Sequence, residues 1–236
     1  MNKAAALAIT AELLAITAAA ASGITAALDG QGSTALQCLL TVSLLLLPTL
    51  LGHFTRIKLP ALFRLIAVAF LFGSAFLGEV RDCYLLLPLW DSVLHLCAGF
   101  MTTAIGFSLG GSVSDEKKAW FTVLFAFCFS MTSEVLWEFY EFAADMLFFT
   151  DMQKDTFVGT VSSVRLGSGR ISVESASLNG MLLAGWLDIG LIDTMKDLLV
   201  NAAGSVLFLI FGFVYLKCGR AAWITRLLPT RRKAEK

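Results

Sequence analysis

Long apolar runs constrain the fold of this chain more than any other feature of its sequence. Six stretches approach the roughly 20 residues that cross a bilayer as a helix, at about 4–28, 36–51, 60–77, 90–109, 119–146 and 193–216. A membrane barrel needs alternating apolar and polar residues, and runs such as 44–47 and 66–77 do not alternate. Charged residues make up 15% of the chain, below the roughly 25% of soluble domains. We therefore predict an all-α fold, a polytopic membrane helix bundle of about six transmembrane helices in a single membrane domain, 1–236.

The basic residues beside these runs predict how the helices are oriented. In a six-span order they gather on one side: Lys3, His53, Arg56, Lys58, Lys117, Lys118 and a basic tail over 217–236. By the positive-inside rule both termini are then cytoplasmic, and 147–192 is an extracytoplasmic loop. Within this loop, 161–173 alternates loosely and indicates either a small hairpin or a mobile segment. We predict a multi-pass protein of the inner (cytoplasmic) membrane.

Acidic residues mark the second half of the fifth run, within 133–145. They are spaced four, three and four apart, at Glu134, Glu138, Glu141 and Asp145. That spacing places all four on one stripe of one helix. Acids within a membrane span are costly and usually face a protein interior, a cavity or a partner.

Two other runs place polar residues at the same predicted depth, in the outer half of the membrane. The fourth run begins with Asp91 and His95, four residues apart, and the sixth begins with a longer set: Asp193, Lys196, Asp197 and Asn201. Three of the acids have ordinary explanations, because Asp91 and Asp193 suit helix N-caps and Asp145 suits the headgroup region. Neither helix capping nor the headgroup region explains the residues that lie deeper in the membrane: His95, Glu134, Glu138 and Asn201.

Seven acids in this region face few basic partners, of which Lys196, His95 and Arg81 are the candidates. Either some carboxyl groups are protonated or a cation is bound. Carboxylates with one imidazole suit Mg²⁺, Mn²⁺ or Ca²⁺. The predicted ligands are Asp91, His95, Glu134, Glu138 and Asp197, and the other polar residues of the site are Glu141, Asp193, Lys196 and Asn201.

These residues resemble the motifs of two membrane-protein families. Asp91 to His95 resembles the D-x-x-x-H of VanZ-like proteins, and Asp197 to Gly204 resembles their D-x-x-x-N-x-x-G, with Glu134 or Glu138 matching their central glutamate. Asp193 to Asp197 is closer to the D-T-x-x-D of YjdF-like predicted inner-membrane proteins. The chain departs from the VanZ-like pattern in its long loop, 148–190. The resemblance implies a site at these residues and leaves its chemistry open.

Three functions fit the sequence. The first is a non-catalytic membrane factor that binds lipid or a partner through 148–190. The second is a metal-assisted enzyme acting on a lipid or lipid-linked substrate, with Glu138, His95 and Glu134 as catalytic residues. The third is a proton- or cation-coupled transporter, which would bind a small cationic ligand. Membrane lipids are expected partners, and a net charge of zero gives no electrostatic case for nucleic acid.

Overall fold

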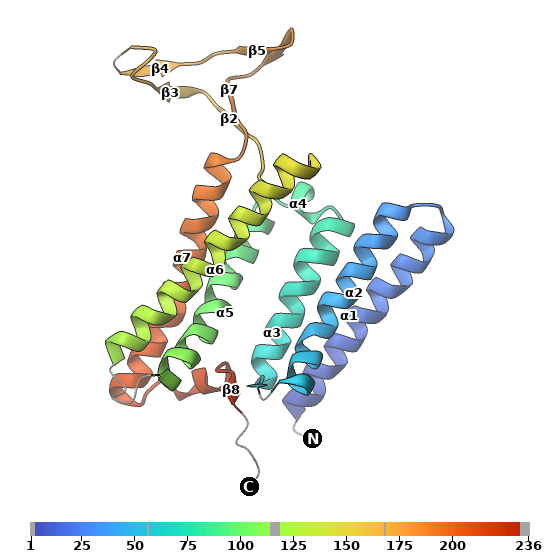
Figure 1. Cartoon of the computed structure of the whole chain (residues 1–236), viewed down its shortest axis with the longest axis vertical. Helices are drawn as coiled ribbons and strands as arrows, with labels where there is room; N and C mark the ends of the chain where they lie inside the picture. Colours follow the sequence, from blue (N-terminus) through green and yellow to red (C-terminus); the bar gives the residue numbers. More distant parts are fainter. Residues whose placement is uncertain (1–2, 56, 114–118, 168, 232–236) are drawn as a thin grey trace. The chain divides into compact units, whose positions relative to one another are not determined.

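The computed structural model describes residues 3–55, 57–113, 119–167 and 169–231. Within these ranges six helices are long and apolar enough to cross a membrane, so the predicted all-α class is confirmed (Figure 1). They are α1 (Lys3–Leu28), α2 (Gly32–Phe54), α3 (Ala61–Leu71) with its π-helical continuation η1 (Phe72–Val80), α5 (Trp90–Val113), α6 (Ala119–Phe148) and α7 (Leu191–Cys218). The short α4 (Cys83–Leu86) precedes α5.

Several helices extend beyond the apolar runs that predicted them. α2 passes both ends of 36–51, and α5 continues beyond 90–109 through Gly110 and Gly111. The physical reason is that hydropathy reports only the length buried in hydrocarbon. Backbone hydrogen bonds continue the helix into the polar zone beyond it.

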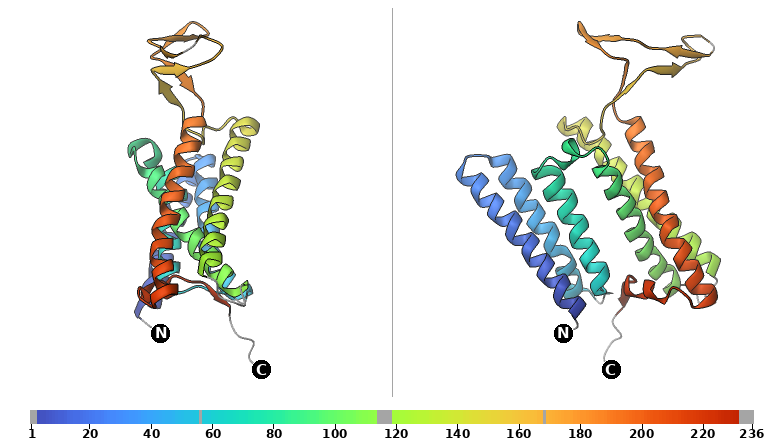
Figure 2. Two further views of the ribbon diagram at one scale, coloured as in Figure 1. Left: turned by 90° about the vertical axis from the view of Figure 1, so that its left-hand side faces the viewer. Right: turned by 180° about the vertical axis from the view of Figure 1, so that it is seen from behind.

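The chain forms two compact units, Met1–Thr132 with Val200–Lys236, and Ser133–Leu199. In the first unit, α1 and α2 form a hairpin and α3 lies beside both, as Figure 1 and the right-hand view of Figure 2 show. Small residues allow the close packing of this hairpin, since a Cβ on Gly23 would lie 2.9 Å from Cβ of Cys38.

A larger core of the first unit joins α3, α5, α6 and α7 through buried residues that include Phe63, Phe107 and Phe208. The chain after α7 forms the short 3₁₀ helix η2 (Ala222–Arg226), whose Ile224 enters this core. It then pairs β8 (Thr230–Arg231) antiparallel with β1 (Ile57–Lys58). The C-terminal segment and the α2–α3 connection therefore lie at one end of this unit. Of the predicted basic side, Arg56, Lys117, Lys118 and the tail beyond residue 231 lie outside the described residues.

The second unit holds the C-terminal part of α6, the first turns of α7 and three antiparallel strand pairs between them. β2 (Thr156–Val158) pairs with β7 (Trp186–Asp188), β3 (Thr160–Ser162) with β4 (Arg170–Ser172), and β5 (Ala176–Leu178) with β6 (Met181–Leu183). Of the two alternatives for 161–173, a hairpin or a mobile segment, the structure has the hairpin, with Val161 opposite Ile171. Asn179 and Gly180 join β5 to β6 with φ of 50° and 83°, the positive values that a two-residue hairpin turn favours.

Candidate functional site

The backbones of α5 and α7 approach each other closely at two glycines of the first unit. A Cβ on Gly99 of α5 would lie 2.1 Å from the backbone oxygen of Asn201, and a Cβ on Gly204 of α7 would lie 2.1 Å from that of Leu96. Backbone atoms cannot move aside as a flexible side chain can. The glycines are therefore a requirement of this helix pair, as small residues are in many membrane helix contacts.

A group of buried polar residues surrounds this contact, and we call Gly99, Ser130, Asn201 and Ser205 the polar seam. Oγ of Ser205 lies 2.7 Å from Oγ of Ser130, and Nδ2 of Asn201 donates to the same oxygen at 3.4 Å. Oγ of Ser130 also donates to the backbone oxygen of Gly99 at 3.3 Å. The three side chains are fully buried. The seam thus joins α5, α6 and α7 by hydrogen bonds as well as by packing.

One polar atom of the seam has no hydrogen-bond partner among the described residues. It is Oδ1 of Asn201, which is buried. A buried acceptor without a partner is rare and costs free energy, so it calls for an explanation such as a bound ion or water.

The directions of the helices at the seam follow from their other contacts. Gly99 of α5 contacts Ser130 of α6, whereas Gly106, later in α5, lies against Ala126, which is earlier in α6. The two helices are therefore antiparallel. Gly212 of α7 lies against Phe107, as Asn201 lies against Gly99, so α5 and α7 run in the same direction.

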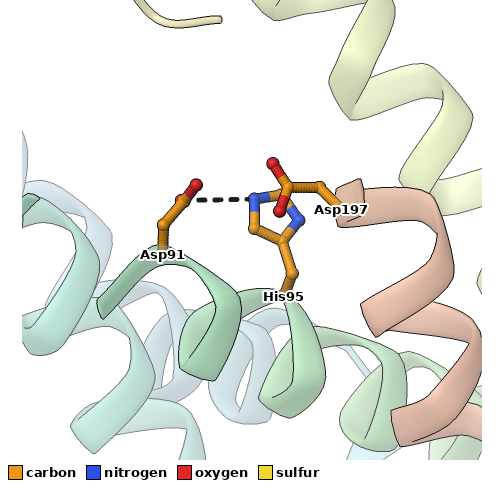
Figure 3. Close-up of side chains that lie close together, drawn as sticks. All are labelled: Asp91, His95 and Asp197. Carbon is orange, nitrogen blue, oxygen red and sulfur yellow. Dashed lines mark ion pairs between the residues drawn. The ribbon is translucent and has the colours of Figure 1, made fainter. Parts of the chain in front are cut away.

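His95 and Asp91 lie on α5 before the seam, in the first unit. Nε2 of His95 is 3.4 Å from Oδ1 of Asp91, one turn away (Figure 3). Both side chains are largely buried, with exposed fractions of 8% and 13%. Asp91 therefore has a specific neighbour, the imidazole of His95, in addition to its place in the first turn of α5. Figure 3 also draws Asp197 of α7, which belongs to the second unit.

In the second unit, three acids of the α6 stripe are buried, while large apolar residues between them are exposed. Glu134, Glu138 and Glu141 are each less than a tenth exposed, whereas Leu136 and Phe139 are more than half exposed. On α7, two acids are equally buried: Asp193 and Asp197. Trp137 donates from Nε1 to Oε1 of Glu141 at 2.8 Å. An apolar outer face with acids turned inward is the arrangement expected of a helix in lipid.

Asp145 and Asp193 hold the chain between the helices. Asp145 accepts hydrogen bonds from the backbone nitrogens of Met152 and Gln153, at 2.7 and 2.9 Å. Asp193 accepts from the backbone nitrogen of Lys154 at 2.9 Å. The two acids thus have a structural task, and for Asp193 this replaces the simple N-cap expected from the sequence.

Negative charge dominates the base of the loop. Partial burial raises the pKa of Asp151, and the carboxylates of Asp155, Asp145 and Asp193 raise it further, while Lys154 acts in the opposite direction. Asp151 lies outside the helical spans, and its raised pKa indicates an excess of negative charge at this end of the second unit.

Lys196 is the basic residue that the sequence predicted at the site. Its Nζ lies 3.7 Å from Asp193 and 3.9 Å from Asp197, with the side chain 43% exposed. At these distances and this exposure each pair contributes little. Arg81, another of the predicted basic partners, lies in the first unit over the ring of Phe76, with Nη2 3.4 Å from Oγ of Ser22.

Sequence reasoning missed a second charged cluster, which we call the clamp: Glu12, Thr49 and Arg64. Nε of Arg64 donates to Oε2 of Glu12 at 2.7 Å and Nη2 donates to the same oxygen, while Thr49 donates to Oε1. Nη2 also donates to Oγ1 of Thr49 at 2.6 Å. The available signal was that Glu12 and Arg64 are isolated charges inside apolar runs.

A comparison with known proteins finds one match for this architecture. Residues 8–218, from the second turn of α1 to the last residue of α7, match the family model described as a predicted membrane protein (DUF2238). No curated protein and no solved structure matches the chain. The match spans all six long helices, and the chain belongs to the DUF2238 family of predicted membrane proteins.

Proposed function

We propose that this protein is a multi-pass membrane factor whose buried carboxylates hold a cation. The observation that carries the proposal is the polar seam, where α5, α6 and α7 meet at Gly99, Ser130 and Asn201. Each helix is continuous at this level, so the helical repeat fixes which residue lies one turn beyond the seam. Toward the start of α5 and α7 and the end of α6, these residues are His95, Asp197 and Glu134. The following turn carries Asp91, Asp193 and Glu138.

The charges of these turns support a cation. α6 has no basic residue, and the turns of α7 before the seam have one, Lys196, which is 43% exposed. A low-dielectric interior disfavours several ionised carboxylates together, so protons or a metal ion must offset them. Carboxylate oxygens and one imidazole nitrogen match the preferences of Mg²⁺, Mn²⁺ and Ca²⁺. Oδ1 of Asn201, buried at the seam, offers a further oxygen of the kind these ions bind.

We assign the residues as follows. The ligands are Asp91, His95, Glu134, Glu138 and Asp197. Glu141 is held by Trp137, and Asp193 and Lys196 lie at the border of the site. A cation here would tie three helices together, which suits a non-catalytic factor. The same residues also support the metal-assisted enzyme, in which the ion acts as a Lewis acid beside Glu138, His95 and Glu134, and the cation-coupled transporter.

Equilibrium binding of Mn²⁺ to the purified protein tests the proposal. We expect saturable binding that Mg²⁺ or Ca²⁺ competes for, weakened at least about tenfold in Glu138→Gln, which removes one ligand charge. The matched control is Glu174→Gln, the same change at an exposed residue of the loop. A protein that binds no Mn²⁺, or a Glu138→Gln variant that binds it as the parent does, contradicts the proposal.

The loop of the second unit favours partner binding as a second function. Its strand pairs have two strands each, so each strand has one open edge. Several apolar side chains of this loop are more than half exposed, among them Phe157, Val164, Leu182 and Trp186. Open strand edges and exposed apolar residues are features of surfaces that bind another chain.

The cellular placement belongs to the same proposal. We infer that both termini are cytoplasmic, that 147–192 lies outside, and that the protein resides in the inner (cytoplasmic) membrane. The pairing of β1 with β8 supports one common side for the α2–α3 connection and the C-terminal segment. Within its family, the D-T-x-x-D of Asp193 to Asp197 supports a YjdF-like assignment. The VanZ-like resemblance stays a prediction.

A further inference from the structure

A basic hollow lies in the first unit. It has a volume of about 380 Å³ and lies where α2 ends, β1 follows and α3 begins. Its polar lining comes from Thr49, His53, Lys58 and Arg64, and Pro48 and Leu59 contribute apolar walls. Among the described residues that line it, none is acidic.

The clamp holds one of these cations in place. The guanidinium of Arg64 is 23% exposed and is fixed through Nε and Nη2 by Glu12 and Thr49. Nη1 takes no part in these bonds. A guanidinium whose position is already fixed loses little conformational entropy when it binds a ligand.

The start of α3 adds to the positive potential. Pro60 precedes the helix, and the first backbone bond of the helix runs from Arg64 to Pro60. The amide groups of the preceding turn are therefore not used within the helix, and its dipole favours an anion there. The cationic side chains of Lys58 and Arg64, the imidazole of His53 and a helix start form an environment for an anion, and no acid is found among the described lining residues.

We propose that this hollow binds a phosphate group. In the orientation proposed above it lies at the cytoplasmic headgroup level, where phosphate is carried by anionic lipids as well as by soluble esters. Basic pockets at this level bind lipid headgroups in other membrane proteins. Lys58 and His53 reach the phosphate as mobile donors, and Arg64 supplies the fixed one.

The experiment uses the full chain, purified and delipidated, with three probes: phosphatidylglycerol, phosphatidylcholine and inorganic phosphate. Binding is measured by native mass spectrometry and by the shift of the melting temperature at constant ionic strength. The variant is His53→Gln with Lys58→Gln, which leaves the clamp intact. The matched control is Lys217→Gln, an exposed basic residue at the end of α7.

We expect the double variant to bind the phosphate probe about five- to tenfold more weakly than the parent, as loss of charge at a headgroup site implies. Lys217→Gln should bind as the parent does. Preference for phosphatidylglycerol over inorganic phosphate assigns the site to a lipid headgroup, and the reverse assigns it to a soluble phosphate. Equal binding by parent and double variant, or equal weakening by Lys217→Gln, overturns the proposal.

Discussion

Replacing Gly99 by alanine is expected to destabilise the protein by at least about 3 kcal/mol, the upper range for inserting a carbon into a packed interior. The added Cβ would lie 2.1 Å from the backbone oxygen of Asn201 and 2.8 Å from the side-chain Oδ1 of the same residue. Relief requires α5 and α7 to separate, and separation breaks the hydrogen bonds of the polar seam. Gly204→Ala should have the same effect, because its Cβ would meet the backbone oxygen of Leu96 at 2.1 Å.

The measurement is the free energy of unfolding in detergent micelles, followed by loss of helical signal during titration with sodium dodecyl sulfate. Gly111→Ala is the matched control, since it lies in the same helix with nothing within 4 Å of the added atom. Alanine also favours a helix over glycine, so this control should be neutral or slightly stabilising. If Gly99→Ala and Gly111→Ala behave alike, α5 and α7 do not make the described contact.

The second large effect is expected at the clamp. Arg64→Met leaves the carboxylate of Glu12 buried without its cation, and Glu12→Met leaves the guanidinium without its anion. Breaking a buried ion pair in this way costs about 3–5 kcal/mol. Glu12 lies on α1, Thr49 on α2 and Arg64 on α3, so each single change should loosen all three helices.

The double variant Glu12→Met with Arg64→Met distinguishes a lost pair from lost packing. Replacing both members of a buried pair by apolar side chains is often close to neutral, so the double variant should recover most of the lost stability. Arg220→Met, at an exposed residue after α7, serves as the control for removing an arginine. Additive losses in the double variant would show that the two side chains act independently.

The sequence was sufficient for the helices because their signal is local. A run of about twenty apolar residues is buried in lipid, where unpaired backbone N–H and C=O groups cost free energy. A helix pairs these groups within the run itself, so the run alone predicts the helix. The strand pairs of the loop were harder to predict, because each strand has three residues and a weak alternation. The alternation over 161–173 indicates a hairpin or a mobile segment and does not decide between them. The pairing of β2 with β7 joins residues about 30 apart and leaves no local pattern.

Only part of the candidate site could be predicted from the sequence. Helical spacing identified Glu134, Glu138 and Glu141 as one stripe, and all three are buried. Asp145 accepts a hydrogen bond from the backbone nitrogen of Met152. Helical spacing does not predict this bond, because Met152 lies beyond the end of the helix. Gly99 was not singled out, because a glycine in an apolar helix becomes informative only when its neighbour is known. One charge near a helix start is common, so Arg64 alone does not indicate an ion pair, and its partner Glu12 lies 52 residues away in the sequence.

Pulsed electron paramagnetic resonance of Mn²⁺ bound to the purified protein tests the cation site most directly. The nitrogen of a coordinated imidazole modulates the electron spin echo, and the chain has two histidines, His53 and His95. We predict a nitrogen modulation that persists in His53→Gln and disappears in His95→Gln. A parent protein without this modulation, or a His95→Gln variant that retains it, contradicts the proposed site.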